Sequence, residues 1–453
     1  MLPEKFIASL AGLPGFDKAA FVETHQVPAD FTSVRMNQFK TFDHAAHLFM
    51  HAKTPVDWCA EGFYLTGRPS FVVDPLWHAG AYYVQEASSM FLHTILSQLA
   101  ETEKYYKVLD LCAAPGGKTT LLANYFKNGL VVANETIKSR NAILEENCIR
   151  WGSDHIVVTQ NDPSHFKAVP NFFDFIIADA PCSGSGMFRK DPQAIAEWSE
   201  ENVLHCSQRQ ERIIEQSIIA LQDGGYFIYS TCSYSFEEDE QILDYIASIE
   251  GMVSVEISIP EAAGIVTTNS PKHKAQGFRF YPDKVKGEGF FIAVFQKQSL
   301  KYKSQFSTPF QFTKLTKSAQ AELDALYPLP IDAQCIQHQA EIIALPSHCI
   351  EDLQTIRAHL YVKKLGMRIG TLKGRDLVPS HDLAMSQWKT MPYEDVPIPL
   401  QDALQFLRRA DFTLTGQKGW HSISYLNCRL GWVKCLPNRL NNYYPNAWRI
   451  LNY

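Results

Sequence analysis

The sequence predicts an α/β protein whose central unit is a doubly wound sheet, and three observations support this prediction. Apolar strand-like segments alternate with amphipathic helical segments from about residue 104 to residue 300. A glycine-containing turn follows the first of these strands. Two later strands end in short polar turns, each of which contains a cysteine. Because such sheets bind their ligands at the carboxyl ends of the strands, these turns mark the expected site.

Hydrophobic periodicity places each element of the central unit in order. We expect strands at Lys107–Leu111, Leu130–Asn134, Ile156–Thr159, Phe173–Ala178, Gly225–Ser230 and Gly289–Gln296. We expect helices at about Lys118–Phe126, Ser139–Arg150, Asn202–Leu221 and Glu237–Ile249.

The segments on either side of this unit have a weaker pattern. Before it, we expect helices at Lys18–Glu23 and Asp43–His51 and a strand-like piece at Thr32–Asn37. After it, polar residues 301–312 predict a linker, and Gly419–Leu436 and Tyr443–Ile450 are expected to form short strands with turns. The sequence therefore divides into an N-terminal region (1–103), the α/β domain (104–300), a linker with an intermediate domain (301–390) and a β-rich module (391–453).

Length and composition exclude several classes of protein. A chain of 453 residues is too long for one hydrophobic core. The N-terminus lacks the pattern of a secretion signal, and no apolar stretch is long enough to span a bilayer. Ten cysteines occur without CxxC pairs, which argues against zinc, and we expect no metal. Reduced thiols in a cytoplasmic protein, with no membrane partner, are the simplest interpretation.

Charge is distributed unevenly along the chain. The net charge is −6, but residues 301–453 hold 18 Lys and Arg against 12 Asp and Glu, a balance of +6. The rest holds 24 basic and 36 acidic residues, a balance of −12. We therefore expect the C-terminal third to bind a polyanion such as a nucleic acid. Chance variation in the charge of a solvated surface is the alternative.

Near the C-terminus, cationic and aromatic residues alternate. They are Arg429, Lys434, Arg439 and Arg449, and Trp432, Tyr443, Tyr444 and Trp448. Cations can contact phosphate and aromatic rings can stack on unpaired bases. Aromatic residues also build the core of a small β module, and we expect that fate for Trp432, with the basic residues outside the core.

The turn after the first strand has the features of a nucleoside-binding site. Pro115-Gly116-Gly117 lets the backbone approach a ligand closely, and a helix is expected to start at Lys118. Glu135 ends the second strand, where a carboxylate can bond a ribose diol, and Asp162 follows the third strand near an expected adenine. A phosphate-binding P-loop is disfavoured, because that motif requires glycine at the position of Cys112.

Two cysteines follow the fourth and fifth strands. Cys182 stands in Asp179-Ala180-Pro181-Cys182, and Cys232 stands in Thr231-Cys232-Ser233. Amino-group methyltransferases carry Asn or Asp followed by Pro-Pro-aromatic at the end of the fourth strand. In this chain Asp179 is followed by Ala180, Pro181 and Cys182, and the cysteine disfavours that chemistry. A single free cysteine is often a small buried hydrophobe. Two at strand ends, each followed by a polar turn, are more typical of a site, and both thiols should face the same crevice if their strands are neighbours.

A pair of thiols beside a carboxylate suits methylation of a pyrimidine. C5 of cytosine is a poor nucleophile, but a thiolate that adds at C6 pushes electron density onto C5. The C5 carbon then attacks a sulfonium methyl group. Charge that grows near N3 needs a proton donor, which Asp179 can be if its carboxyl is protonated in the site. Two thiols also permit a division of labour between attack on the base and release of the product.

Several stretches of the chain resemble the RNA cytosine-5 methyltransferases of the Nol/Nop/Sun family. The motif resemblance lies in Val108–Thr119, Ala178–Gly186 and Ser230–Ser233, with further family-like segments at Phe31–Lys40, Gln85–Met90 and Arg279–Phe291. Within the family the chain is similar to the bacterial branch that methylates 16S rRNA of the small subunit. Gly431–Ile450 resembles, more loosely, that branch's C-terminal PUA-like module.

The resemblance implies a fold, a cofactor and roles. It implies a Rossmann-like S-adenosylmethionine-dependent methyltransferase core, an N-terminal RNA-recognition region and a C-terminal α+β, β-rich PUA-like extension that binds RNA. Cys232 would be the attacking thiol and Cys182 the group that assists product release, whereas DNA cytosine-5 methyltransferases attack from the Pro-Cys motif. Asp179 would stabilise the base at N3, and Lys118 is expected to pair with Asp179.

The cofactor and RNA sites are also implied by the resemblance. The expected cofactor-binding residues are Cys112, Ala113, Ala114, Pro115, Gly116, Gly117, Lys118, Glu135, Arg140, Asp162 and Asp179. The expected RNA-binding residues are Arg35, Lys40, Arg189, Lys190 and Arg439.

Two other functions remain open. The same motifs serve methylation of tRNA, and only the C-terminal extension favours ribosomal RNA or the small ribosomal subunit as the partner. A non-catalytic RNA-binding factor of ribosome assembly would also keep the fold, but the presence of Cys182, Cys232 and Asp179 speaks against it. A monomer is expected.

Overall fold

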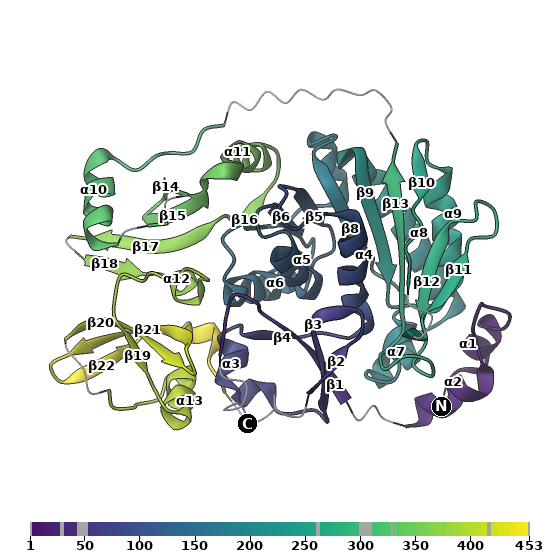
Figure 1. Cartoon of the computed structure of the whole chain (residues 1–453), viewed down its shortest axis with the longest axis horizontal. Helices are drawn as coiled ribbons and strands as arrows, with labels where there is room; N and C mark the ends of the chain where they lie inside the picture. Colours follow the sequence, from purple (N-terminus) through teal and green to yellow (C-terminus); the bar gives the residue numbers. More distant parts are fainter. Residues whose placement is uncertain are drawn as a thin grey trace.

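The protein contains one large central sheet and three small sheets, shown in Figure 1. The computed structural model describes residues 2–27, 31–42, 53–259, 263–298, 310–327, 329–330, 332–374, 376–414 and 418–451. The predicted α/β class is confirmed. In the described part of the chain, no helix is both long enough and apolar enough to cross a bilayer.

Five parallel strands form the middle of the central sheet, in the order β9-β8-β5-β6-β7. They are β5 (Lys107–Asp110), β6 (Leu130–Asn134), β7 (Ile156–Thr159), β8 (Phe173–Asp179) and β9 (Leu221–Thr231). Five of the six predicted strands are these, with β9 starting four residues earlier than expected, and the sixth, predicted at Gly289–Gln296, is β13 (Phe290–Lys297). The order reverses between β5 and β8, which places a topological switch point at the carboxyl edge.

An antiparallel group of strands extends the sheet beyond β9. It consists of β13 (Phe290–Lys297), β12 (Gln276–Phe280), β11 (Val266–Asn269) and β10 (Met252–Ser254), which pairs with β13. On the opposite edge, β16 (Val362–Lys364) pairs antiparallel with β7. The segment after residue 301 thus contributes a strand to the central sheet.

Helices cover both faces of this sheet, and each face has its own buried apolar core. The helices are α4 (Leu92–Leu99), α5 (Gly117–Tyr125), α6 (Lys138–Trp151), α8 (Glu200–Ser217) and α9 (Glu240–Ser248), while α7 (Pro192–Glu197) packs at the separate cluster around Phe6. The Ser199 hydroxyl caps α8 by accepting from the Asn202 amide at 3.0 Å.

Two predicted helices have different bounds. The helix expected to reach Leu221 ends at Ser217, and a 3-10 turn over Ile218–Ala220 leads directly into β9. The helix expected from Glu237 begins at Glu240, because the two preceding side chains turn into the interior and accept hydrogen bonds there.

The N-terminal region divides between two places. Its elements are α1 (Glu4–Ser9), α2 (Lys18–Gln26), β1 (Phe31–Met36), β2 (Lys53–Val56), β3 (Cys59–Thr66), α3 (Pro75–His78) and β4 (Tyr82–Val84). Helices α1 and α2 pack against the α/β domain through Phe6 and Phe21, which contact Tyr234. The strands form the sheet β2-β3-β1-β4. The predicted helix Asp43–His51 lies outside the described residues.

The rest of the chain forms two small sheets. The first segment holds α10 (Lys317–Leu326), β14 (Ala333–His338), β15 (Glu341–Pro346), α11 (Ile350–His359), β17 (Met367–Lys373), β18 (Asp376–Pro379) and α12 (His381–Met385). The terminal module holds β19 (Asp395–Pro397), α13 (Leu400–Arg408), β20 (Gly419–Tyr425), β21 (Cys428–Leu436) and β22 (Arg439–Asn442).

The expected strand over Tyr443–Ile450 is wrong. The last strand, β22, comes earlier, and residues 446–448 form a 3-10 turn. The Tyr444 ring is fully buried, where it packs on the Phe406 ring and its amide binds Asn442, so the chain folds back over α13.

The terminal module packs on the N-terminal sheet. One apolar core combines residues of β1, α3 and β4 with residues of α13, β20 and β21. The first and last parts of the chain therefore form one packed body with the central domain, and removal of the C-terminal third would expose this core and the edge of β7.

Candidate active site

The two cysteine turns lie side by side at the carboxyl edge of the sheet. Strands β8 and β9 are parallel neighbours, and Asp179 pairs in register with Ser230. Beyond the strand ends, the Gly186 amide donates to the Cys232 carbonyl at 2.8 Å. A Cβ at Gly186 would lie 2.8 Å from that carbonyl oxygen and 2.4 Å from that of Gly289, so only glycine allows this approach.

The two thiols touch each other. The Sγ atoms of Cys182 and Cys232 are 3.1 Å apart, and both residues are partly exposed. Hydrogen bonding to Cys232 and burial raise the pKa of the Cys182 thiol well above its usual value. Cys182 therefore keeps its proton and can donate it in a hydrogen bond to the neighbouring sulfur.

A carboxylate and an ammonium group lie at the end of β8. The Asp179 Oδ2 atom is 2.8 Å from the Lys118 Nζ atom, and Oδ1 accepts from the Ser230 hydroxyl at 2.8 Å. The predicted pairing of Lys118 with Asp179 is therefore present. Asp179 is 36% exposed, so its carboxylate is accessible to a ligand at this edge.

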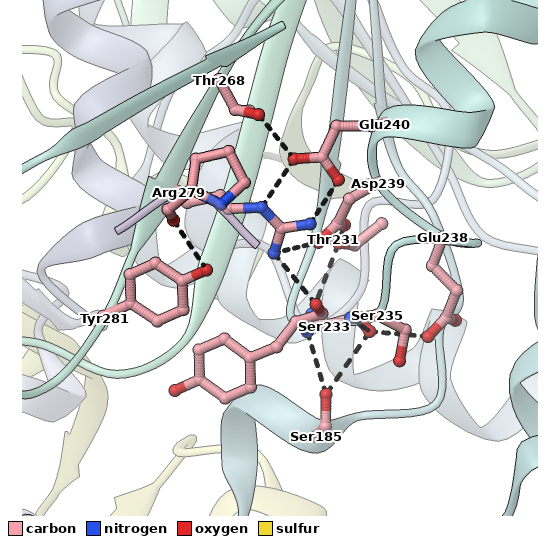
Figure 2. A network of polar contacts seen from close by, with 12 residues as sticks. Ser185, Thr231, Ser233, Ser235, Glu238, Asp239, Glu240, Thr268, Arg279 and Tyr281 are labelled. Atoms are coloured by element: carbon pink, nitrogen blue, oxygen red, sulfur yellow. Dashed lines mark hydrogen bonds and ion pairs between the residues drawn. The ribbon is translucent and has the colours of Figure 1, made fainter. Parts of the chain in front are cut away.

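A buried acidic turn follows the Cys232 turn in the chain, and Figure 2 shows its polar contacts. Glu238, Asp239 and Glu240 are consecutive and almost fully buried. The Arg279 guanidinium binds Glu240 and lies 3.1 Å from Asp239, and the Thr231 hydroxyl donates to Asp239 at 2.8 Å. The turn thus ties the end of β9 to β12.

The predicted cofactor turn joins β5 to α5. Gly116 has a φ of 114°, a left-handed conformation that favours glycine, and it immediately precedes the first turn of α5. The Arg140 guanidinium donates to the Ala114 carbonyl at 2.8 Å, and the Asn147 amide donates to the Pro115 carbonyl at 2.8 Å. These bonds from α6 hold residues 112–118 in place. Burial raises the pKa of the Cys112 thiol, so this cysteine stays protonated.

Two of the predicted cofactor carboxylates follow β6 and β7. Glu135 is 4% exposed, its Oε1 accepts from the Ile137 amide at 2.9 Å, and its Oε2 lies 3.3 Å from Arg140. Asp162 accepts from the amide and hydroxyl of Ser164 at 3.0 and 2.7 Å. The structure therefore places the Gly116 turn, Glu135 and Asp162 after three neighbouring strands of one edge.

Sequence reasoning missed Asp110, the residue that ends β5. Asp110 is fully buried, accepts from the Thr119 hydroxyl at 2.6 Å, and has a pKa raised to about 7 by burial. It also missed Glu238. The signal for Glu238 was the run of four acidic residues at 237–240, which is unusual directly after a buried strand.

Two expected RNA-binding residues do not present a free charge. Arg35 is 1% exposed, and its guanidinium donates to Gln85 at 2.8 Å and to Thr120 at 2.6 Å. Lys40 donates to two backbone carbonyls at 2.5 and 2.6 Å, and burial lowers its pKa to about 7. Their positions argue against the predicted RNA contacts, because both cations join the N-terminal sheet to its neighbours.

The other expected RNA-binding residues differ in exposure. The side chain of Arg189 is 7% exposed, and its guanidinium lies 3.6 Å from the buried Glu288 carboxylate. The side chain of Lys190 is 34% exposed, and its ammonium lies 3.7 Å from the same carboxylate. Arg439 on β22 is exposed.

In the same module the Arg429 guanidinium donates to three backbone carbonyls, so the expectation that it lies free outside the core is wrong. Trp432 is fully buried, as predicted.

One group of potential metal ligands lies away from this edge. A Cys59 sulfur, a Glu61 oxygen and a His93 ring nitrogen lie within 4.8 Å of one another in the described part of the chain. Burial raises the pKa of Cys59 to about 12, and its thiol donates to Glu61 at 3.5 Å. Since a metal ligand must be a thiolate, we assign no ion to this group.

Three family profiles match the chain. One described as "16S rRNA methyltransferase RsmB/F" matches residues 96–296. Residues 2–87 match the N-terminal domain of 16S rRNA methyltransferase RsmF, and residues 393–450 match the methyltransferase RsmF PUA domain.

Relatives named "Ribosomal RNA small subunit methyltransferase F" match over nearly the whole chain. One from Vibrio cholerae is 32% identical and covers 98% of this chain and 97% of its own. One from Shewanella loihica is 30% identical over 91% and 88%. Among solved structures, a methyltransferase homolog protein from Pyrococcus horikoshii is 28% identical, with a TM-score of 0.52 over 65% of this chain and 100% of its own. NSun6 from Pyrococcus horikoshii with SFG shares the fold, at 20% identity and a TM-score of 0.54 over 66% of this chain and 98% of its own.

Proposed function

The chain belongs to the RsmB/F family of 16S rRNA methyltransferases, and from this premise we propose that it methylates C5 of a cytosine in small-subunit ribosomal RNA, with S-adenosylmethionine as donor. The observation that carries the proposal is the pair of thiols 3.1 Å apart at the ends of β8 and β9. Two touching thiols beside an accessible carboxylate suit a reaction in which one sulfur attacks a base and the other acts on the adduct.

Cys232 is the nucleophile in this proposal. Its sulfur bonds to C6 of the cytosine, the C5–C6 π electrons move to C5, and C5 takes the methyl group. The raised pKa of Cys182 supports this assignment, because a thiol that keeps its proton is a poor nucleophile but a good hydrogen-bond donor to a neighbouring thiolate.

The pair of Asp179 and Lys118 faces the ring during this step. Negative charge moves toward N3 and the ring carbonyl while C6 is bonded to sulfur. The Lys118 ammonium group, 2.8 Å from the Asp179 carboxylate, offers an N–H donor and a positive charge near that position. We propose that Asp179 contacts N3 and that Lys118 orients Asp179.

Cys182 assists the release of the product. The adduct breaks down when a base removes the C5 proton and the C6–sulfur bond cleaves, which restores the aromatic ring and the Cys232 thiolate. The Cys182 sulfur lies 3.1 Å from that of Cys232, so it stands next to the adduct and is the group we propose to assist this step.

The edge formed by β5, β6 and β7 is the proposed cofactor site. S-adenosylmethionine supplies an electrophilic methyl group on its sulfonium. The residues present fit it, because the buried Glu135 carboxylate lies at the position expected for a ribose diol, and its Oε2 accepts no hydrogen bond among the described residues, with Arg140 as its ion-pair partner at 3.3 Å. Residues 112–118 would border the amino-acid part, Asp162 would face the adenine, and Arg140 would hold the turn in shape.

RNA recognition is proposed for the two ends of the chain, residues 1–103 and 391–453. Of the predicted RNA-binding residues, Arg439 in the terminal module has an exposed side chain, and Lys190 of the α/β domain, outside these two regions, is 34% exposed. Phosphate contacts of such cations release counterions and make binding depend on salt.

The proposal is tested by mapping 5-methylcytosine in RNA from cells with and without this gene. We expect one methylated cytosine in 16S rRNA to disappear, and to return when the wild-type gene but not a Cys232→Ala variant is supplied. Loss of 5-methylcytosine from tRNA with intact 16S rRNA would establish the alternative substrate. No change in either RNA would favour the non-catalytic assembly factor.

A further inference from the structure

Glu238 is a buried carboxylate that touches both thiol-bearing turns. Its Oε1 accepts from the Ser183 amide at 2.8 Å and from the Gln210 side chain at 3.1 Å. Its Oε2 accepts from the Ser183 hydroxyl at 2.5 Å and from the Ser233 hydroxyl at 2.6 Å. Ser183 directly follows Cys182, and Ser233 directly follows Cys232. One carboxylate therefore bridges the two residues next to the two thiols.

The position of Glu238 is itself rigidly held. Its own carbonyl accepts from the buried Tyr229 hydroxyl at 2.7 Å. The next residue, Asp239, binds Thr231 and lies 3.1 Å from Arg279 (Figure 2). The carboxylate is thus fixed to β9 and β12 on one side, and on the other it binds the buried Ser183 and Ser233 of the two turns.

We propose that Glu238 is a positioning residue that sets the contact between Cys182 and Cys232, and its effect on methyl transfer rests on the function proposed above. A carboxylate suits this task because it accepts several hydrogen bonds at once, and all the groups that face it are donors. Burial raises the pKa of Glu238, while the bonds from Ser183 and Ser233 oppose that shift, so these donors keep a costly charge in the interior.

A purely structural carboxylate would affect stability, but it would leave the spacing of the sulfurs unchanged in the folded protein. The two roles are separated by a chemical measure of that spacing. Diamide oxidises two adjacent thiols to a disulfide: two protons and two electrons move to its N=N bond, and one S–S bond forms. The rate at which the Cys182–Cys232 disulfide forms, followed by peptide mass spectrometry, reports how often the sulfurs meet.

We expect Glu238→Ala in the full-length protein to slow this disulfide formation by about a hundredfold, because loss of the bridge lets the turns separate by about 1 Å. Glu238→Gln, which keeps one acceptor oxygen, should have an intermediate rate. Glu237→Gln is the matched control. It removes a charge from the adjacent residue, which makes no hydrogen bond to either turn within the described residues, and it should oxidise like the wild type.

A wild-type rate in a Glu238→Ala protein that unfolds at the wild-type temperature would overturn the proposal. Should Glu238→Ala fail to fold, Ser183→Ala combined with Ser233→Ala removes both hydroxyl donors and leaves the carboxylate. The same slowing is expected there, and a wild-type rate would equally overturn the proposal.

The rate of methyl transfer is a second measurement of the role of Glu238. Glu238→Gln should lower kcat for substrate RNA and leave KM and S-adenosylmethionine affinity nearly unchanged. The diamide reaction uses neither RNA nor cofactor. If the wild-type protein methylates no RNA, the proposed function fails, while the oxidation rates still test whether Glu238 sets the thiol contact.

Discussion

At the carboxyl edge of the central sheet, Asp239 and Glu240 are buried and paired with Arg279, whereas in the terminal module Arg439 and Arg449 stand exposed on the surface. The same kinds of side chain therefore perform different tasks. Buried charges with fixed partners hold backbone segments at set distances, because each lost partner leaves a costly unpaired group. Exposed charges are free to bind an external phosphate, and each contributes little to folding.

This difference predicts how each region responds to substitution. Changes at the catalytic edge should alter chemistry or stability by large amounts and leave the salt dependence of RNA binding unchanged. Changes at exposed cations of the terminal module should alter the salt dependence of RNA binding and leave chemistry and stability nearly unchanged. The following predictions test that division, beginning with the largest effect.

Cys232→Ala should abolish methyl transfer, with a loss of roughly a thousandfold or more, because no other group can form the bond to C6. S-adenosylmethionine affinity should be nearly unchanged, since the thiol acts on the base. Methyl-transfer assays and calorimetric titration of the cofactor test this. Cys206→Ala, at a buried cysteine of α8, is the control and should remain active. Appreciable activity of Cys232→Ala would assign the attack to another residue.

Cys182→Ala should stop turnover but trap the protein on RNA. Attack by Cys232 and methylation proceed, and removal of the C5 proton stalls. A denaturing gel should then show a slow RNA-dependent band that is absent from the Cys182→Ala/Cys232→Ala double variant. A band that appears with Cys232→Ala alone would show that the two thiols have exchanged roles.

Arg279→Met should destabilise the fold by about 3–5 kcal/mol, because it leaves two buried carboxylates without their cation. Arg449→Met, at an exposed arginine whose guanidinium binds only Asn446 among the described residues, should change stability by less than about 0.5 kcal/mol. Thermal unfolding of the two variants measures the contrast directly. Similar melting temperatures would contradict the division between buried and exposed charges.

Arg439→Glu should weaken RNA binding several-fold without affecting cofactor binding or stability. If Arg439 contacts one phosphate, the slope of log affinity against log salt should fall by about one. Arg439→Lys keeps the charge and serves as the control. A point substitution is preferable to truncation near Lys301, because the terminal module shares an apolar core with the N-terminal sheet. An unchanged salt slope would move recognition to other surfaces.

The sequence determined the central fold and the place of the two cysteine turns within it. Strands β5 to β9 follow from short apolar runs, because a strand buried on both faces must be apolar along its length. The neighbouring thiols follow from the same logic, since two turns after adjacent parallel strands meet at one edge. The Lys118–Asp179 pair, which was expected beside the family resemblance, is also present.

Only the tertiary structure decided which charges are free and what holds the thiols together. Arg35 and Lys40 have the sequence pattern of surface cations, yet both are buried and donate hydrogen bonds to residues more than thirty positions away. The sequence predicted that Glu238 lies in the first turn of a helix. In the structure its carboxylate accepts a hydrogen bond from Ser183, which is 55 residues away in the chain. Local sequence specifies periodicity and turns, but burial of a charge depends on which distant donors the fold brings to it, and that information is absent from any short segment.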